Sequence, residues 1–306
     1  MDVVTGAFSF TGRAIAEELL ARGRPVRTLS RRPAENGDPM AARVERATLQ
    51  FSDRAALIEA MRGAEVLYTT YWVRFERGGS TFARAVENIR VLVQAAREAG
   101  VRRVVHVSVS NPSESSPFAY YRGKALAERH VADSGLSYAV VRPTLVYGPH
   151  DILLNNIAWT LRRFPFFAVS GDGGYRVQPV AIAEVASLCV DAGADGPSVT
   201  FDAAGPETYS YVELVRLIAA AVGRSARIAW LPGTVVLALA KVVGMVSRDV
   251  LVNREELGAL RAELLCSSEP PRGHRSFAAW LAEAGSTLGT RYMSELERNF
   301  RSYEPL

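Results

Sequence analysis

Short apolar runs alternate with longer helical stretches through the first half of this 306-residue chain, and this order constrains the fold most strongly. The runs are near-continuously apolar, with Val the most frequent residue, which is typical of strands buried on both faces of a parallel sheet. Strand-helix-strand order predicts helices on both faces of that sheet. We predict strands at 1–5, 25–30, 44–51, 66–70, 103–109 and 137–141, with helices at 10–22, 53–61, 81–98 and 120–133.

After Arg142 the alternation loosens, and helices dominate from Ala229 onward. We predict an α/β chain in which a Rossmann-type, doubly wound parallel sheet is accompanied by a smaller, mostly helical substrate lobe. The sheet domain takes residues 1–146 and is completed by 176–205; the lobe takes 147–175 and 206–306. A ligand is expected at the carboxyl ends of the strands, where the strand order reverses.

The loop after the first strand has the spacing of a phosphate-binding turn. Gly6 can form the tight turn, Gly12 permits close packing of helix on strand, and the helix N-terminus offers N–H groups to an anion. Ser9 stands where the middle glycine is usual, and its hydroxyl could donate to a phosphate oxygen. The alternative is a merely structural turn. The cofactor-binding candidates in this loop are Gly6, Phe8, Ser9, Phe10, Thr11 and Gly12.

The end of the second strand indicates which dinucleotide binds. Sites for NAD usually place Asp or Glu there, to bond the ribose hydroxyls of the adenosine. This strand ends in Leu29-Ser30-Arg31-Arg32. Two guanidinium groups favour a 2′-phosphate, so Arg31 and Arg32 predict NADP, with NAD less favoured. An Arg-rich chain weakens the inference, because such a pair arises by chance more readily.

Tyr120 and Lys124 lie four residues apart on a predicted helix, so they share one of its faces. The chain has 36 basic residues, and Lys124 and Lys241 are its only lysines, which makes a chance Tyr-x-x-x-Lys match rare. A nearby ammonium favours the phenolate. Tyr120 is therefore our candidate general acid or base. Tyr121 offers no alternative, because Ala125 lies four residues beyond it.

Ser108 and Ser110 follow the fifth strand in Val104-Val105-His106-Val107-Ser108-Val109-Ser110. Alternation along a strand points both serines the same way at its carboxyl end. Either hydroxyl could hold a substrate oxygen, and capping of loop backbone is the alternative for each.

Taken together, these motifs resemble the short-chain dehydrogenase/reductase superfamily, in its extended and atypical branch with NAD-dependent epimerase/dehydratase proteins. The segment from Arg142 to Pro149 and the stretches 172–180 and 204–207 are also similar to that branch and to the dehydrogenase-like accessory subunit of respiratory complex I. The resemblance implies that Lys124 contacts the nicotinamide ribose and the phenol, and that Pro143 lines the nicotinamide side. It favours Ser110 over Ser108 for the catalytic serine.

Three features depart from this branch. Ser9 replaces a glycine, Tyr71-Trp72 stands where small alanines are common, and the loop before Tyr120 is shorter than in sugar-nucleotide epimerases. The aromatic pair would crowd the nicotinamide, contact an apolar substrate, or belong to the core. Two functions follow: an NAD(P)-dependent oxidoreductase or epimerase-type enzyme acting on a hydroxyl or carbonyl carbon, and a non-catalytic NADP(H)-binding redox sensor or complex-stabilising protein.

Composition narrows the remaining classes. Two cysteines and four histidines at scattered positions predict neither a disulfide scaffold nor a metal site. A net charge of +4 without a basic block argues against nucleic acid, and the start of the chain lacks the pattern of a secretory signal, so we expect a cytoplasmic monomer or homodimer with a small-molecule substrate. The apolar segment 231–246 is too short to span a membrane and is expected to be a buried or groove-lining helix, with peripheral membrane contact as the alternative.

Overall fold

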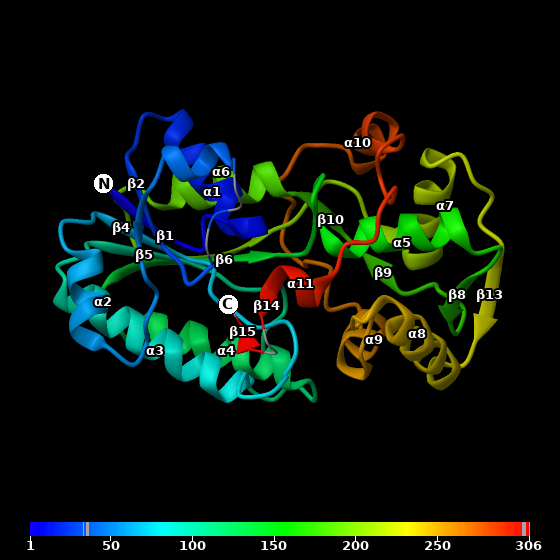
Figure 1. Ribbon diagram of the computed structural model, residues 1–306, viewed down its shortest axis with the longest axis horizontal. Coiled ribbons are helices and arrows are strands. Elements are labelled where there is room, and N and C mark those ends of the chain that lie inside the picture. Colours follow the sequence, from blue (N-terminus) through cyan, green and yellow to red (C-terminus); the bar gives the residue numbers. More distant parts are fainter. Residues whose placement is uncertain (33, 35–36, 302–303, 306) are drawn as a thin grey trace. The chain divides into compact units, whose positions relative to one another are not determined.

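The computed structural model describes residues 1–32, 34, 37–301 and 304–305. The chain divides into two compact units (Figure 1). Unit 1 takes Met1–Pro143, Ile182–Ala203 and the chain end from Glu304, and unit 2 takes Thr144–Ala181 and the residues from Ala204 to 303. Residues 144–146, 176–181 and 204–205, which we predicted to belong to the sheet domain, lie in unit 2.

A parallel sheet of seven strands forms the centre of unit 1. Its order is β3-β2-β1-β4-β5-β6-β11, so the order reverses between β1 and β4. The third strand is shorter than expected, because only the exposed edge residues 45–47 pair with β2. The strands are β1 (Asp2–Thr5), β2 (Val26–Leu29), β3 (Glu45–Ala47), β4 (Val66–Thr69), β5 (Arg103–Val107), β6 (Ser137–Pro143) and β11 (Val199–Ala203).

Helices cover both faces of this sheet (Figure 1). On one face α1 (Phe10–Ala21) packs against α6 (Ile182–Ala192), and on the other α3 (Phe82–Glu98) packs between α2 (Arg54–Met61) and α4 (Ala119–Ala132). A short 3₁₀ helix, η1, spans Pro39–Ala42. The face under α3 and α4 is a continuous apolar core in which Leu67, Ile89 and Val104 are fully buried. The α/β prediction is confirmed.

Unit 2 is built from short strand pairs and helices. Strands β7 and β10 pair in parallel, as do β8 and β13, while β9 and β12 are antiparallel. Its core gathers side chains of α5, α7 and α10. The elements are β7 (Leu145–Tyr147), α5 (Ile152–Arg163), β8 (Phe167–Ser170), β9 (Arg176–Val177), β10 (Pro179–Ala181), β12 (Tyr209–Ser210), α7 (Tyr211–Ala221), β13 (Ile228–Leu231), α8 (Gly233–Ser247), α9 (Arg254–Arg261), α10 (Phe277–Ala284), α11 (Glu295–Asn299) and β14 (Phe300–Arg301); the last strand of the chain is β15 (Glu304–Pro305).

Helices dominate the C-terminal third as expected, and strand β13, which was not predicted, forms because β8 offers an edge for parallel pairing. One expectation for this region is wrong. Helix α8 was expected to be buried or to line a groove, yet Gly244 is its only buried residue, and Val242 and Val246 are 53% and 84% exposed. Among the described residues, no helix has the length and hydropathy needed to cross a membrane.

Candidate active site

The glycine loop joins β1 to α1 at the point where the strand order reverses. Gly6 has a φ of +70°, a left-handed conformation that glycine adopts without strain. A Cβ at position 12 would lie 2.2 Å from the Gly6 carbonyl oxygen, so only glycine permits this approach of helix to strand. The Ser9 hydroxyl donates to that same carbonyl at 2.7 Å and does not cap α1. The backbone of the first turn is therefore not capped by the side chain of its own N-cap residue.

The other loop residues divide between the core and the helix start. Phe8 is buried, with the guanidinium of Arg46 5.5 Å from the centre of its ring. Its side chain therefore belongs to the core, and only its backbone can serve a ligand. Phe10 and Thr11 form the first turn of α1. The Ala7 N–H donates to the Thr28 hydroxyl at 3.0 Å, which fixes the loop to β2.

Positive charge gathers just beyond β2. Arg31 is exposed and Arg32 is half-buried, and the Ser30 hydroxyl bonds the backbone of Arg32. On α1, Arg13 forms an ion pair with Asp38, and this guanidinium lowers the pKa of the Asp38 carboxyl, with a smaller effect from Arg32. Residues 33 and 35–36, which continue this loop, lie outside the described chain.

Lys124 is buried on α4, where its ammonium donates to the Val107 carbonyl oxygen at 3.1 Å. The same nitrogen lies 4.7 Å from the centre of the Trp72 ring, in the arrangement of a cation–π contact. Burial lowers the pKa of Lys124 to about 7, and the charge of Glu128 opposes that shift. The ammonium therefore titrates near neutrality.

Tyr120 belongs to an aromatic cluster with Trp72 and Phe82. Its ring meets the edges of both, at centroid distances of 6.0 and 5.8 Å, while Trp72 stacks on Phe82 at 6.2 Å. The Trp72 indole nitrogen is buried without a hydrogen-bond partner in the described structure. Tyr71 points elsewhere: its hydroxyl accepts from Asn88 at 2.7 Å. Of the aromatic pair, Trp72 is thus the residue that lies beside Tyr120 and Lys124.

The serine-bearing strand continues past β5. The N–H groups of Ser108 and Ser110 donate to Val141 and Pro143 carbonyls at 2.8 and 2.9 Å, so both serines share one face with His106. This is the face covered by α4, because the charge of Lys124 on α4 lowers the pKa of the His106 imidazole. The Ser108 hydroxyl is buried and has no partner among the described residues. The structure thus brings both candidate serines to the α4 side of the sheet.

Sequence reasoning did not single out two groups beside Lys124. His106 is fully buried, and burial first and Lys124 second hold its imidazole pKa well below the usual value, so it is neutral. Glu128, one turn beyond Lys124, accepts from the Arg142 guanidinium at 3.0 and 3.2 Å. The i, i+4 spacing of Lys124 and Glu128 could have indicated that the two side chains share a helix face. Nothing in the sequence indicated that β6, which carries Arg142, approaches α4.

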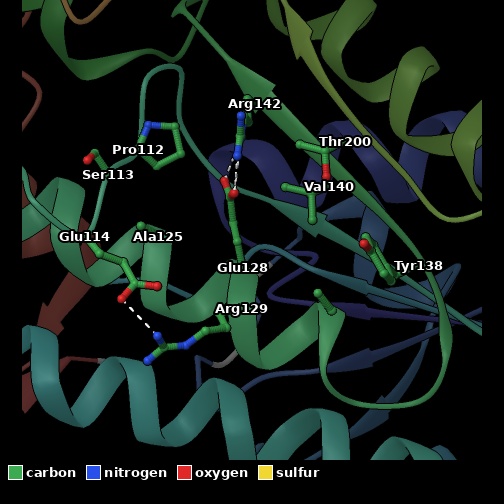
Figure 2. A pocket seen from close by; sticks show the side chains of 11 residues that line it. Pro112, Ser113, Glu114, Ala125, Glu128, Arg129, Tyr138, Val140, Arg142 and Thr200 are labelled. Atoms are coloured by element: carbon green, nitrogen blue, oxygen red, sulfur yellow. Dashed lines mark hydrogen bonds and ion pairs between the residues drawn. The ribbon is translucent and has the colours of Figure 1, made fainter.

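Figure 2 shows this Glu128–Arg142 pair on the wall of a pocket of ≈ 340 Å³ at the β6–β11 edge of the sheet. A second ion pair, between Glu114 and Arg129, lies at its rim. Neither Tyr120 nor Lys124 lines this pocket, which is separate from the glycine loop.

The residues present fit a bound dinucleotide. A left-handed glycine turn leads into a helix that Ser9 leaves uncapped, arginines follow β2, and a titratable ammonium lies on α4. Residues 6–151 match the family model described as NAD(P)H-binding. This part of the chain has a Rossmann-type parallel sheet and is similar to the NAD(P)H-binding family, and the predicted resemblance is confirmed at that level.

Three curated relatives share sequence with the chain. Sterol demethylase protein B of Methylococcus capsulatus is 35% identical over 53% of this chain and 56% of its own length. A farnesyl-dihydroquinoline-oxide ketoreductase of Stigmatella aurantiaca is 31% identical over 63% of this chain and 64% of its own length. The alpha subcomplex subunit 9 of NADH dehydrogenase (ubiquinone) from Arabidopsis thaliana is 26% identical over 82% of this chain and 64% of its own length. The chain therefore spans less than two thirds of the length of each.

A solved structure extends the similarity to both units. The NADPH-dependent quinone oxidoreductase of Escherichia coli, determined with NADPH, matches with a TM-score of 0.74 over 94% of this chain and 99% of that one. At 20% sequence identity this match shows the fold alone.

Proposed function

We propose that this protein is an NADP(H)-linked oxidoreductase that interconverts a hydroxyl and a carbonyl on an apolar small molecule. In this proposal Tyr120 transfers the proton of the reacting oxygen, Lys124 supports Tyr120 and the cofactor ribose, and Ser110 or Ser108 holds the oxygen. The reaction class is related to that of the quinoline ketoreductase, which is named for the reduction of a ketone.

The observation that carries the proposal is the placement of Tyr120 and Lys124 on one face of α4. The buried ammonium has a pKa of about 7, so small changes in its surroundings switch its charge at neutral pH. A charged Lys124 favours the phenolate of a tyrosine on the same face, and a neutral Lys124 favours the phenol. Such a pair can give or take a proton at a substrate oxygen.

Trp72 supports an apolar substrate. With Phe82 it forms an aromatic wall at the Tyr120 ring. A wall of this kind contributes contact area but few hydrogen bonds, which suits a ring system or an isoprenoid better than a sugar. The names of two relatives, with a sterol and a farnesylated quinoline, agree with this substrate class.

When bound, NADPH would supply the hydride that reduces the carbonyl carbon. The chain's own residues do the rest. Gly6 to Gly12 would hold the pyrophosphate at the start of α1, and Arg31 with Arg32 would hold the 2′-phosphate. Tyr120 gives its proton to the carbonyl oxygen during reduction and takes it back in the reverse direction. Pro143, the buried last residue of β6, would close the nicotinamide side.

A second function is favoured by one observation. The similarity to the NADH dehydrogenase subunit covers 82% of this chain, more than either of the other relatives covers. That subunit's name describes membership of an assembly, so the alternative is an NADP(H)-binding protein that stabilises a complex or senses redox state, with Tyr120 and Lys124 not turning over substrate.

The test begins with titration calorimetry of the purified chain against NADPH and NADH. Oxidation of NADPH is then followed at its absorbance band with a panel of apolar ketones and quinones. Tyr120→Phe is expected to lower kcat by about 10²–10⁴-fold with NADPH affinity unchanged. Tyr121→Phe is the matched control, because it removes a neighbouring hydroxyl on a different face of α4 and is expected to retain activity.

Full turnover in Tyr120→Phe would contradict the role of this tyrosine. Tight binding of NADPH with no turnover of any substrate in the panel would favour the second function. Failure of both NADPH and NADH to bind would overturn both readings.

A further inference from the structure

Helix α8 presents the largest set of exposed apolar side chains in unit 2. Between Gly233 and Ser247 its polar residues with functional side chains are Thr234, Lys241 and Ser247. The exposed members of the face are Val235, Leu239, Val242, Met245 and Val246, and Trp230 of the preceding strand β13 is 49% exposed. A continuous set of exposed apolar side chains on a protein surface is characteristic of an interaction site.

The exposed side chains form one stripe along α8. Val235, Leu239, Val242 and Val246 follow one another at spacings of four, three and four residues, which is the repeat of a single helix face. Met245 and Lys241 lie at one margin of that stripe, and the opposite side of the helix contacts β8. The helix is thus anchored to unit 2 by one side and leaves the apolar stripe uncovered by the described residues.

The chain segment that contains α8 carries charge of one sign. From Leu214 to Arg248 the sequence contains no Asp or Glu, but it contains Arg216, Arg224, Arg227, Lys241 and Arg248. The segment from Ile152 to Gly171, which includes the partner strand β8, also lacks acidic residues. Within the described part of the chain, neither Lys241 nor Arg248 forms an ion pair. The two charged residues on α8 and at its C-cap are therefore both positive, and no described ion pair neutralises them.

The acidic groups on the elements next to α8 are engaged elsewhere. Helix α9 contacts the start of α8, and its Glu256 forms a capping box with Asn253. Glu255 beside it is half-buried, and Glu263 beyond α9 pairs with Arg176.

Asp249 follows α8 but is buried, and its carboxylate accepts from Tyr292 and from the backbone of Glu295 and Leu296. Asp172 lies beyond β8 and accepts from the backbone of Gly174.

We propose that the α8 stripe docks unit 2 on an anionic lipid surface. The helix lies flat with its apolar stripe among the acyl chains, its basic residues meet lipid phosphates, and Trp230 sits at the headgroup level. Fifteen residues give a length of ~22 Å, which suits a helix lying in the interface and cannot cross the ~30 Å hydrocarbon core. This docking is independent of the proposed reaction.

The test is co-sedimentation of the purified full chain with vesicles. Vesicles of phosphatidylcholine containing phosphatidylglycerol are expected to bind the chain, vesicles of phosphatidylcholine alone to bind it weakly, and added salt to release it. The double variant Leu239→Gln/Val242→Gln is expected to weaken binding by about ten-fold or more, because two apolar side chains no longer enter the acyl region. Lys241→Glu is expected to weaken binding to the anionic vesicles alone.

Two control variants change exposed residues of unit 1. Val199→Gln removes an exposed apolar side chain, and Arg62→Glu reverses an exposed charge; both are expected to bind vesicles as the wild type does. Circular dichroism of each variant checks that it is folded.

Three results would overturn the proposal. The first is no binding of the wild type to anionic vesicles, and the second is undiminished binding of the folded double variant. The third is a homodimer, measured by light scattering after size exclusion, that the double variant dissociates; this would assign the stripe to a second copy of the chain.

Discussion

The ammonium of Lys124 lies 4.7 Å from the centre of the Trp72 ring, and burial lowers the pKa of this lysine to about 7. A ring face stabilises a cation, whereas removal from water destabilises it. Desolvation is the larger of the effects on this pKa and exceeds the opposing charge of Glu128. Burial of the Lys124 ammonium therefore carries an energetic penalty, which lowers the free energy of unfolding. A lysine that serves only the fold would reach solvent, as Lys241 does on α8.

That penalty predicts the stability of Lys124→Met. The pKa falls from 10.5 to about 7, so between these values the unfolded chain binds more protons than the folded chain and stability rises with pH. At pH 7 and below, the wild type carries the full cost. We expect Lys124→Met to raise the free energy of unfolding at pH 7 by about 1–3 kcal/mol while abolishing turnover. Urea unfolding at pH 7 and pH 10 should show the difference narrowing at the higher pH.

Lys241→Met is the matched control for this experiment, because it replaces the other lysine of the chain at an exposed position. It should leave the pH dependence of stability as in the wild type. A Lys124→Met protein less stable than the wild type at pH 7 would show that the Val107 hydrogen bond outweighs desolvation.

The arginines after β2 predict cofactor preference. Arg31→Ala should weaken NADPH binding by about 10–100-fold, the effect of losing a charge-assisted hydrogen bond to a phosphate, and should leave NADH binding nearly unchanged. Titration calorimetry with both cofactors measures the two affinities, and Arg62→Ala controls for the loss of one positive charge elsewhere in unit 1. Equal weakening for NADH and NADPH would remove Arg31 from the 2′-phosphate site.

Gly12→Ala tests the contact of α1 with the glycine loop. Its new Cβ would lie 2.2 Å from the Gly6 carbonyl oxygen, so helix and strand must separate. We expect a loss of about 1–3 kcal/mol in the free energy of unfolding, together with weaker NADPH binding. Gly196→Ala is the control, since a Cβ there meets nothing within 4 Å and its stability should match the wild type. Thermal melts with and without NADPH distinguish the two effects.

Asp151 predicts a pH dependence in unit 2. It accepts from the backbone of Leu153 and Leu154 at the start of α5, and burial raises its pKa from 3.8 to about 7. The folded chain therefore binds more protons than the unfolded chain between these values, and stability falls as pH rises from 4 to 7.

Asp151→Asn keeps an oxygen acceptor without the charge, so it should be more stable than the wild type at pH 8 and equal to it near pH 4. Chemical denaturation at both pH values measures this. Asp53→Asn, at the exposed start of α2, is the control, and its stability relative to the wild type should not change between the two pH values in this way. Identical pH profiles for wild type and Asp151→Asn would contradict the expectation.

Local patterns were sufficient to predict most of unit 1. The strand-helix alternation places the first six strands of the sheet along the chain, β1 to β6, within a few residues, and the four-residue spacing places Tyr120 and Lys124 on one face of α4. Both depend on neighbours along the chain. The roles of the residues themselves remain predictions.

Features that depend on distant segments were missed. Trp72, in the loop after β4, reaches Lys124, and Arg142 reaches Glu128 because β6 packs against α4. Periodicity indicates which face of a helix is apolar but not which element covers that face. The apolar sequence of α8 therefore predicted a buried or groove-lining helix. Strand β13 was missed for the same reason, since its partner β8 lies about sixty residues earlier.

The packing of α1 against α6 has a consequence for synthesis. Helix α1 ends at Ala21, but the helix that covers it begins at Ile182, and the Arg22–Asp191 ion pair joins residues 169 positions apart. The apolar side of α1 therefore leaves the ribosome long before its partner is made. Unit 1 cannot complete its central sheet until residue 203 has emerged, so we expect nascent chains truncated before α6 to depend on chaperones and to aggregate when released.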